Sequence, residues 1–535
     1  MNSDTEKEII FPNEQISRLF IIFSLGVTLF YSLWWLDFSN MESRILYGLL
    51  FIGEAYHIWQ VIGYIYTVRD QKKYTCRVVP PYFSPAVDVF ITVCGEPTKV
   101  VEETLAGAMA IDYPNYRIYI LNDGYVAKKE NWREIEDLAK KYGANVITRT
   151  IPGGAKAGNI NNGLKQTNAP FFALFDADHA PKKDFLKKTL AYFQDSKMAL
   201  VQTPQYYKNK DQNHLTRSAW EQQELFFGPI CQGKNKDNAT FWCGTNAVIR
   251  RSALEEIGGI LENTVTEDFL VSLYLHQKGY KSIYIPEILS EGLAPQDLKS
   301  YVSQQYRWAR GCLDLIFNHN PIFKKGLTKA QKIHYLYSSS YYLNGLIVAI
   351  NALIPIFVLM SGISPVKENV NNFMIYFFPF IFTTIYLLMK STKFKITFNA
   401  IQISMSSFFV FIAAAISALF NVKTKFKVTS KTEQSGNYLV YALPHITYIL
   451  LTIFAITFAV TKHGFTPSVV TNTSWALFNI VFFLGFIRVA YPWETVTAHL
   501  KSKVSSFYIQ TANFTRKRES ILHQVNLSPE KENQK

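Results

Sequence analysis

The sequence is poor in cysteine, and the cysteines that it has are scattered. There are five, Cys76, Cys94, Cys231, Cys243 and Cys312, with no CxxC pair and no histidine cluster at the spacing of a zinc site. An odd number of dispersed thiols is typical of a reducing cytoplasm. The set argues against a disulfide framework and against a zinc site.

The pattern of a nucleic-acid-binding protein is also lacking. The formal net charge is +14, but no basic stripe interleaved with aromatic residues stands out. The excess cations lie near the ends of apolar segments. Attraction to anionic lipid and to a negatively charged substrate explains the excess of positive charge. We therefore expect membrane lipid as a partner and no nucleic acid.

Charge is sparse outside a central stretch, residues 69–332. Apolar runs long enough to cross a bilayer, which takes ~20 residues, flank that stretch. They are residues 19–36, 336–365, 371–389, 396–422, 438–461 and 464–487, with a further run at 45–66 that Glu54 and His57 interrupt. The first run follows an acidic start and has no small-residue cleavage site, so we do not expect it to be a cleaved signal peptide. The pattern predicts a soluble domain flanked by membrane helices.

Run 396–422 is amphipathic in its first half, where Asn399, Gln402 and Ser406 share one side of a helix. Lysines stand at both of its ends. A helix in the membrane interface accommodates cations at both ends, whereas a span would place one cluster outside. We therefore predict six spans and one interface helix, with a seventh span as the alternative. The positive-inside rule then places the central domain and both termini in the cytoplasm.

Strand-like and helical runs alternate from Asp88 onward, which predicts an α/β domain with a parallel sheet. In such sheets ligands bind beyond the carboxyl ends of the strands. Asp123 and the pair Asp176 and Asp178 follow apolar runs at such ends. Two carboxylates one residue apart can bind a hard divalent cation that in turn binds phosphate oxygens.

Two more motifs lie in helical runs. Thr266, Glu267 and Asp268 open one helix, where Thr266 alone could be an ordinary N-cap. The second, Gln304-Gln305-Tyr306-Arg307-Trp308, offers a guanidinium for a diphosphate and a flat ring for a sugar. The alternative for that motif is an interfacial helix anchored by its tryptophan.

Together these motifs resemble the processive family-2 glycosyltransferases, the superfamily of cellulose, hyaluronan and chitin synthases. The motifs that carry the resemblance are Asp123, Asp176-x-Asp178, Thr266-Glu267-Asp268, Gln304-Gln305-x-Arg307-Trp308, Lys156-Ala-Gly-Asn159, Gln202-Thr-Pro-Gln205 and Phe241-Trp-Cys-Gly-Thr245. Residues 426–431 match the FxVTxK gating loop of cellulose-synthase-like β-glucan synthases. The sequence departs from the family at Val93, Cys94 and Gly95, at Asn122 and at Gly154.

The resemblance implies a GT-A (Rossmann-like) domain inserted in a helical membrane bundle. The implied divisions are two spans (1–70), a cytoplasmic GT-A domain with interface helices (71–325), two spans (326–392), an interface helix with the gating loop (393–438), two spans (439–493) and a basic cytoplasmic tail (494–535). No counterpart of the cyclic-di-GMP-sensing domain of many bacterial relatives is expected on this chain.

The resemblance also implies the site. The catalytic residues would be Thr266, Glu267 and Asp268, with Asp268 as the general base. Donor-binding residues would be Glu96, Asp123, Lys156, Asp176, Gln304, Arg307, Phe426, Val428, Thr429 and Lys431. Acceptor-binding residues would be Cys243, Gly244, Thr245 and Trp308, and Asp176 and Asp178 would hold Mg²⁺ or Mn²⁺.

The implied reaction is processive, inverting transfer of glucose from UDP-glucose to a growing β-glucan, coupled to its translocation across the membrane. Alternatives are a hyaluronan- or chitin-type donor, a non-processive transferase with a lipid acceptor, and a membrane channel or scaffold with an inactive transferase-like domain. The sequence leaves open the linkage of the product, the oligomeric state and accessory secretion subunits.

Overall fold

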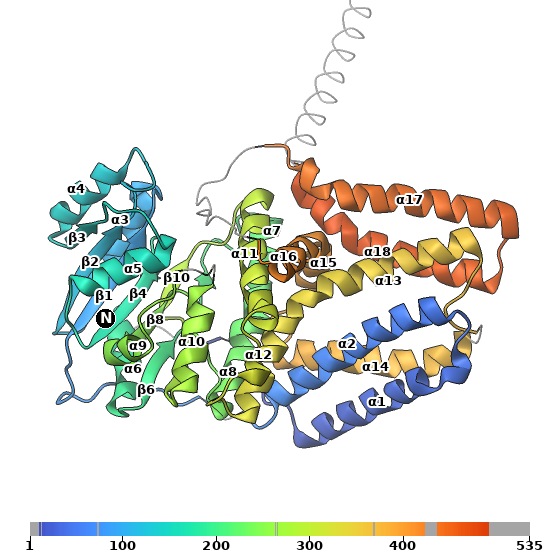
Figure 1. Ribbon diagram of the computed structural model, residues 1–535, viewed down its shortest axis with the longest axis horizontal. Coiled ribbons are helices and arrows are strands. Elements are labelled where there is room, and N and C mark those ends of the chain that lie inside the picture. The colour runs from blue at the N-terminus through green and yellow to red at the C-terminus, as the bar shows by residue number, and fades with distance from the viewer. Residues whose placement is uncertain are drawn as a thin grey trace, which may run out of the picture.

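The computed structural model describes residues 10–491, apart from residues 12, 72–73, 263, 265, 368–369 and 423–435. A domain built on a sheet lies at one end, and long helices run side by side at the other (Figure 1). Two helices, α11 (Leu298–Phe317) and α12 (Lys329–Ser340), stand crosswise between these two parts. The order of parts agrees with the sequence, which places the charged stretch between apolar runs.

A seven-stranded sheet in the order β3-β2-β1-β4-β8-β6-β9 organises the first part. Its strands are β1 (Val87–Val93), β2 (Tyr116–Asn122), β3 (Asn145–Thr148), β4 (Phe171–Asp176), β6 (Met198–Gln202), β8 (Ala247–Arg250) and β9 (Lys281–Tyr284). A small sheet, β5 (Ala180–Pro181), β10 (Ser290–Gly292) and β7 (Tyr206–Tyr207), lies beside it. The expected α/β class is confirmed.

The sheet is mixed, so the prediction of a parallel sheet was wrong in this respect. β8 runs antiparallel to both neighbours, β4 and β6, while β1, β2, β3 and β4 pair in parallel. A crossover helix joins two parallel strands. The long connection from β6 to β8 instead brings the chain back in the opposite direction, so β8 pairs antiparallel with β6. The parallel half carries the acids that the sequence singled out.

Helices cover both faces of the sheet, because alternate strand residues face two separate cores. Val89 and Ile91 of β1 belong to one core and Phe90 to the other. Helices α3 (Thr98–Met109), α4 (Trp132–Tyr142) and α6 (Phe185–Leu190) pack on the first face, and α5 (Ala155–Lys165), α9 (Arg251–Glu256) and α10 (Glu267–Gln277) on the second. Helices α7 (His214–Leu225) and α8 (Cys231–Lys234) connect this domain to the long helices.

Six helices in the described part of the chain are long and apolar enough to cross a membrane. They are α1 (Arg18–Leu36), α2 (Arg44–Val68), α13 (Asn344–Ser361) continuing from α12, α14 (Val370–Ser391), α17 (Leu439–His463) and α18 (Pro467–Ala490). This set agrees with six of the seven apolar runs, and it makes the chain a multi-pass membrane protein.

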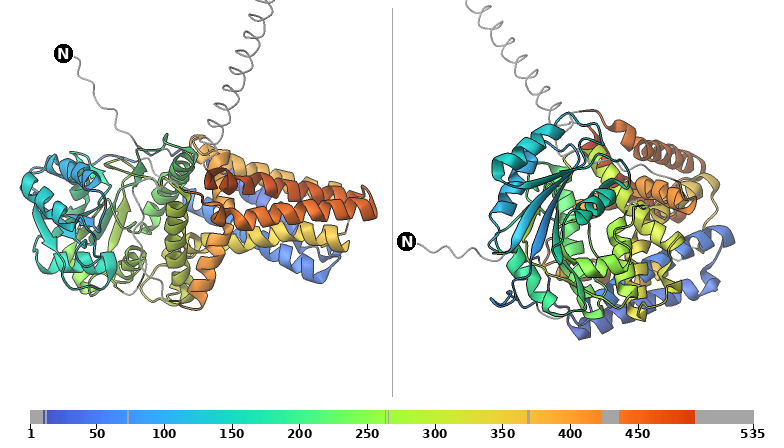
Figure 2. Two further views of the ribbon diagram at one scale, coloured as in Figure 1. Left: turned by 90° about the horizontal axis from the view of Figure 1, so that it is seen from above. Right: turned by 60° about the vertical axis from the view of Figure 1, so that its left-hand side comes forward.

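The seventh run is broken into α15 (Phe398–Ser406) and α16 (Phe408–Leu419), with a bend of 45° between them. Both figures show the pair lying crosswise to α17 and α18, as an interface helix would lie (Figures 1 and 2). Its length and composition would also allow the pair to be a seventh span. α16 packs along α11 through small residues, among them Ala309, Ala414 and Ala418.

Candidate active site

A cavity of about 550 Å³ opens at the carboxyl ends of β1, β2 and β4. In the register of the sheet Val93 pairs with Asn122 and Thr92 pairs with Asp176, so Asp123, which directly follows β2, and Asp176, which ends β4, lie at the same edge. The cavity brings together most residues that the sequence predicted. These are Glu96, Asp123, Lys156, Asp176, Asp178, Cys243, Gly244, Thr266, Glu267, Asp268, Gln304, Arg307 and Trp308.

One end of the cavity holds Asp123 in a bidentate ion pair with Arg149. The Nε and Nη2 atoms of Arg149 each donate to a carboxylate oxygen of Asp123 at 2.7 Å, and both side chains are buried. Burial raises the pKa of Asp123, and the nearby guanidinium opposes that shift. Arg149 was missed by sequence reasoning, although it follows the edge strand β3 directly. The pair fixes the rotamer of Asp123.

Lys156 lies at the centre of the cavity. Its ammonium donates to the Asp176 carboxylate and to the carbonyl oxygen of Gly244, the latter at 2.8 Å. Burial acts to raise the pKa of Asp176, but Lys156 and His179 outweigh it and hold that pKa below its usual value. Asp176 is therefore an anion, and Lys156 joins the end of β4 to the loop before β8.

The pair Asp176 and Asp178 has a third potential metal ligand in His179. One ligand atom of each residue lies within 4.8 Å of the others. Neither ring nitrogen of the buried His179 has a hydrogen-bond partner among the described residues, and Nδ1 lies 3.4 Å from Asp178 Oδ1. Two carboxylates beside an imidazole with a nitrogen to spare fit a divalent cation. Sequence reasoning missed His179, whose position directly after Asp178 was the available signal.

Asp268 and Glu267 lie in the first turn of α10. Burial, followed by the negative charge of Glu267, raises the pKa of Asp268 to about 7. Gly244 makes room for this carboxylate: its φ is +82°, and a Cβ there would lie 2.9 Å from Asp268 Oδ2. A carboxyl group with a pKa near neutrality is suited to take a proton.

Thr266 does not cap α10 with its side chain, as the ordinary alternative would have it. The residue is buried, and its Oγ1 has no hydrogen-bond partner among the described residues. Its side chain instead packs against Gly311 of α11, where no Cβ would fit. Thr266 thus brings α10 and α11 into close contact.

Helix α11 supplies Gln304, Arg307 and Trp308 to the far wall of the cavity. The side chain of Asp297 fixes the start of this helix by accepting a hydrogen bond from the Ser300 amide at 2.9 Å. Burial lowers the pKa of Arg307, while the carboxylate of Asp176 acts in the opposite direction. The motif of α11 therefore faces the acids at the strand ends.

Thr245 is a predicted acceptor-binding residue that does not line the cavity. Its side chain is fully buried, and Oγ1 accepts a hydrogen bond from the backbone N–H of Asp176 at 2.9 Å. This contact supports the end of β4. The gating-loop residues Phe426, Val428, Thr429 and Lys431 lie outside the described residues, so their assignment stays a prediction.

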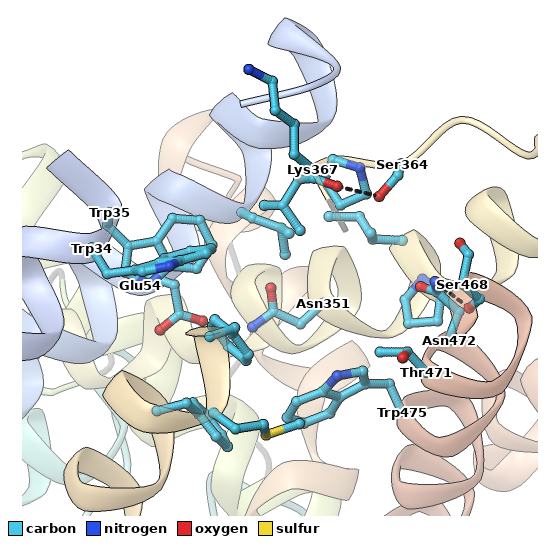
Figure 3. Close-up of a pocket in the computed structure, with 18 residues that line it drawn as sticks. Trp34, Trp35, Glu54, Asn351, Ser364, Lys367, Ser468, Thr471, Asn472 and Trp475 are labelled. Atoms are coloured by element: carbon cyan, nitrogen blue, oxygen red, sulfur yellow. Dashed lines mark hydrogen bonds between the residues drawn. The ribbon is translucent and has the colours of Figure 1, made fainter. Parts of the chain in front are cut away.

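A second cavity, of about 190 Å³, lies among the long helices α1, α2, α13, α14 and α18. Glu54, Asn351 and Trp475 face it, while the ammonium of Lys367 points away (Figure 3). Tyr31 donates to Glu54 Oε2 at 2.9 Å, and His57 Nδ1 lies 3.5 Å from the same oxygen. Tryptophan rings with amide and carboxylate groups are a lining suited to a sugar chain.

Comparison with known families matches both parts of the chain. Residues 85–311 match the family described as glycosyltransferase like family 2, and residues 255–496 match the cellulose synthase family. The chain therefore joins a glycosyltransferase family 2 region to a cellulose synthase region.

Two curated relatives are cellulose synthase catalytic subunits [UDP-forming]. That of Pseudomonas fluorescens is 35% identical over 339 residues, 61% of this chain and 45% of that protein. That of Komagataeibacter xylinus is 31% identical over 407 residues, 74% of this chain and 54% of that protein. The chain thus spans about half the length of these relatives.

Among solved structures, a mannosyltransferase from Pyrobaculum calidifontis, in complex with GDP-Man and Mn²⁺, has a TM-score of 0.50 at 16% identity. The match covers 71% of this chain and 99% of that one. At this identity the likeness concerns the fold alone, and it agrees with the GT-A fold expected for the first part.

Proposed function

We propose that this chain, which joins a glycosyltransferase family 2 region to a cellulose synthase region, is a processive, inverting glycosyltransferase. It transfers glucose from UDP-glucose to the end of a growing β-glucan. The observation that carries the proposal is the convergence of Asp176, Asp268, Arg307 and Trp308 in one cavity beside membrane helices. A neutral sugar polymer and a diphosphate donor together account for that mixture of groups.

The donor lies along the strand ends. Asp123, held by Arg149, faces the nucleoside, and Lys156 and Arg307 face the diphosphate. The acceptor hydroxyl meets Asp268, which takes its proton while the oxygen attacks the anomeric carbon from the side opposite the leaving UDP. This single displacement converts an α-linked donor to a β-linked product. Burial, together with the negative charge of Glu267, keeps the pKa of Asp268 high enough for this role.

A divalent cation, Mg²⁺ or Mn²⁺, would be held by Asp176, Asp178 and His179. When bound it would neutralise the diphosphate and make UDP a better leaving group. Lys156 donates to the carboxylate of Asp176, and the Thr245 hydroxyl accepts from the backbone N–H of Asp176, so both the side chain and the backbone of this residue are held before any ligand arrives. In this proposal Thr245 supports the metal site and is no longer assigned to acceptor binding.

Trp308 stacks the acceptor sugar at the membrane side of the cavity, with Cys243 and Gly244 on the adjoining wall. From there the glucan crosses the helix bundle and passes the second cavity. The tryptophans, Asn351 and Glu54 of that cavity provide the stacking faces and hydrogen-bonding groups that a glucan requires (Figure 3). The positive-inside distribution of cations supports a catalytic domain and two termini in the cytoplasm, and the proposal keeps the domain divisions expected from the sequence.

The test is the replacement of Asp268 by Asn in the purified full-length chain. Asp268→Asn leaves the shape of the site intact but removes the base, so polymer formation should fall by ~10²–10⁴-fold. UDP binding should persist, because Asp268 faces the acceptor and not the nucleotide. The wild-type product is identified by digestion with linkage-specific glucanases.

Offering UDP-N-acetylglucosamine or UDP-glucuronate in place of UDP-glucose tests the other donors. If the protein made polymer from one or both of these donors and none from UDP-glucose, the proposed donor sugar would be wrong. Near-normal synthesis by Asp268→Asn would remove Asp268 as the base.

A further inference from the structure

The loop after β2 returns across the nucleoside end of the cavity. Ala127 N donates to Asp123 O at 3.0 Å and Lys129 N donates to Gly124 O at 2.8 Å, which closes two successive turns. The side-chain amide of Asn131 donates to Glu96 O at 2.8 Å and ties the loop to the end of β1. These bonds place Lys129 beside the first residues after β1.

The stem of Lys129 lies directly over Gly95. A Cβ at Gly95 would be 2.5 Å from Lys129 Cγ, 2.6 Å from Cδ and 3.0 Å from Cε. Gly95 also has φ +88°, a conformation that favours glycine. Any larger residue at position 95 would therefore displace the lysine, so the missing side chain is what admits the Lys129 stem.

Lys129 is the cation of this end that remains available to a ligand. It lines the cavity with Cys94, Glu96 and Asp123. Arg149 and Lys156, which also line the cavity, are paired with Asp123 and Asp176. Lys129 forms no ion pair with any residue that the structure describes. The same end of the cavity therefore offers one cation, Lys129, and two carboxylates, Glu96 and Asp123, as potential hydrogen-bond donor and acceptors for a ligand.

We propose that Lys129 determines base specificity, by donating a hydrogen bond from its ammonium to a carbonyl oxygen of uracil. The inference rests on the proposed UDP-sugar donor. Uracil presents a carbonyl oxygen at C4 beside an N3–H donor, and Glu96 or Asp123 accepts from that N–H. Cytosine presents an amino group at C4 and an unprotonated N3, so it would set a donor against the ammonium and an acceptor against the carboxylates.

The experiment measures binding of UDP and CDP to the full-length protein by calorimetry, with the same metal concentration throughout. Lys129→Ala should weaken UDP binding about tenfold, the value of one charge-assisted hydrogen bond at an exposed site. CDP binding should change much less, so the preference for UDP should shrink. Lys128→Ala is the matched control: it removes an exposed cation one residue away that does not line the cavity, and it should leave both affinities unchanged.

A second variant approaches the same contact from the other side. Gly95→Ala keeps Lys129 but pushes its stem away, and it should reproduce the reduced preference for UDP. Lys129→Arg should retain part of the preference, since a guanidinium also donates. An unchanged UDP-to-CDP ratio in Lys129→Ala would overturn the inference.

Binding and transfer separate this inference from the proposed function. Wild-type protein that binds UDP through Lys129 but transfers no sugar would refute the transferase and leave the base contact standing. Wild-type protein with no affinity for UDP would refute both.

Discussion

The two cavities of this protein differ in the groups that line them. The cavity at the strand ends is lined by both acids and cations, among them Asp176, Lys156 and Arg307. The cavity among the long helices has aromatic rings, hydroxyls and amides, and Glu54 is the charged group that faces it in Figure 3. Fixed charges stabilise a diphosphate as it leaves, whereas a neutral glucan needs flat faces and hydrogen bonds.

The difference has a structural cause. The parallel strands of the sheet end at one edge, which opens onto the cavity. Charged side chains at that edge can therefore form ion pairs with one another, as Asp123 does with Arg149 and Asp176 with Lys156. Membrane helices pay heavily for each unpaired charge. Accordingly, the carboxylate of Glu54 is bonded to Tyr31 and lies near His57. Changes in the first cavity should therefore abolish chemistry, and changes in the second should alter passage of the product.

The largest effect should come from the metal site. Chelation by EDTA should abolish transfer, and Mg²⁺ or Mn²⁺ should restore it. His179→Ala should raise the metal concentration needed for half-maximal activity by about tenfold or more, because it removes one of three ligands. Mn²⁺ titration followed by electron paramagnetic resonance measures the same affinity without turnover. An unchanged Mn²⁺ affinity in His179→Ala would leave Asp176 and Asp178 as the protein ligands and remove His179.

The sequence predicted the parts of the site that follow directly from buried runs. β1, β2 and β4 are apolar strands, and the acids after β2 and β4 had to project from one edge once the strands were paired in parallel. β8 escaped prediction because its antiparallel pairing depends on partners that are distant in the sequence, and so did the mixed character of the sheet.

Contacts between distant loops also escaped prediction. Arg149 acts through Asp123, and Lys129 reaches the cavity by crossing Gly95, which no motif signals. Thr245 belonged to a recognised motif, but the motif did not say that its hydroxyl faces Asp176. By contrast, the sequence did predict that α11 is a helix. It did not predict that α11 lies so close to Thr266 that only a glycine fits at position 311.

A smaller effect should come from pH, and it should be confined to the strand-end cavity. Asp268 must be deprotonated to accept a proton, and its pKa is about 7. The rate should therefore be constant above pH 7 and fall about tenfold per pH unit below it. Glu267→Gln removes the negative neighbour that raises this pKa, so the acid limb should move to lower pH. A limb that stays in place would mean that another group controls it.

The smallest effect should come from Trp475, which faces the cavity among the helices (Figure 3). Trp475→Ala removes a stacking face for the glucan, and stacking on one aromatic ring contributes about 1 kcal/mol. Polymer yield should therefore fall only a few-fold, with shorter chains, while the affinity for UDP and the pH profile stay those of the wild type.

Chain length measured by size-exclusion chromatography, together with UDP binding, distinguishes an effect on the cavity among the helices from an effect on the cavity at the strand ends. Leu477→Ala on the same helix is the control, since Leu477 is an exposed apolar residue that does not line the cavity. Weaker UDP binding in Trp475→Ala would show that the two cavities do not act independently, and equal losses in both variants would mean that the effect of Trp475 is one of helix packing.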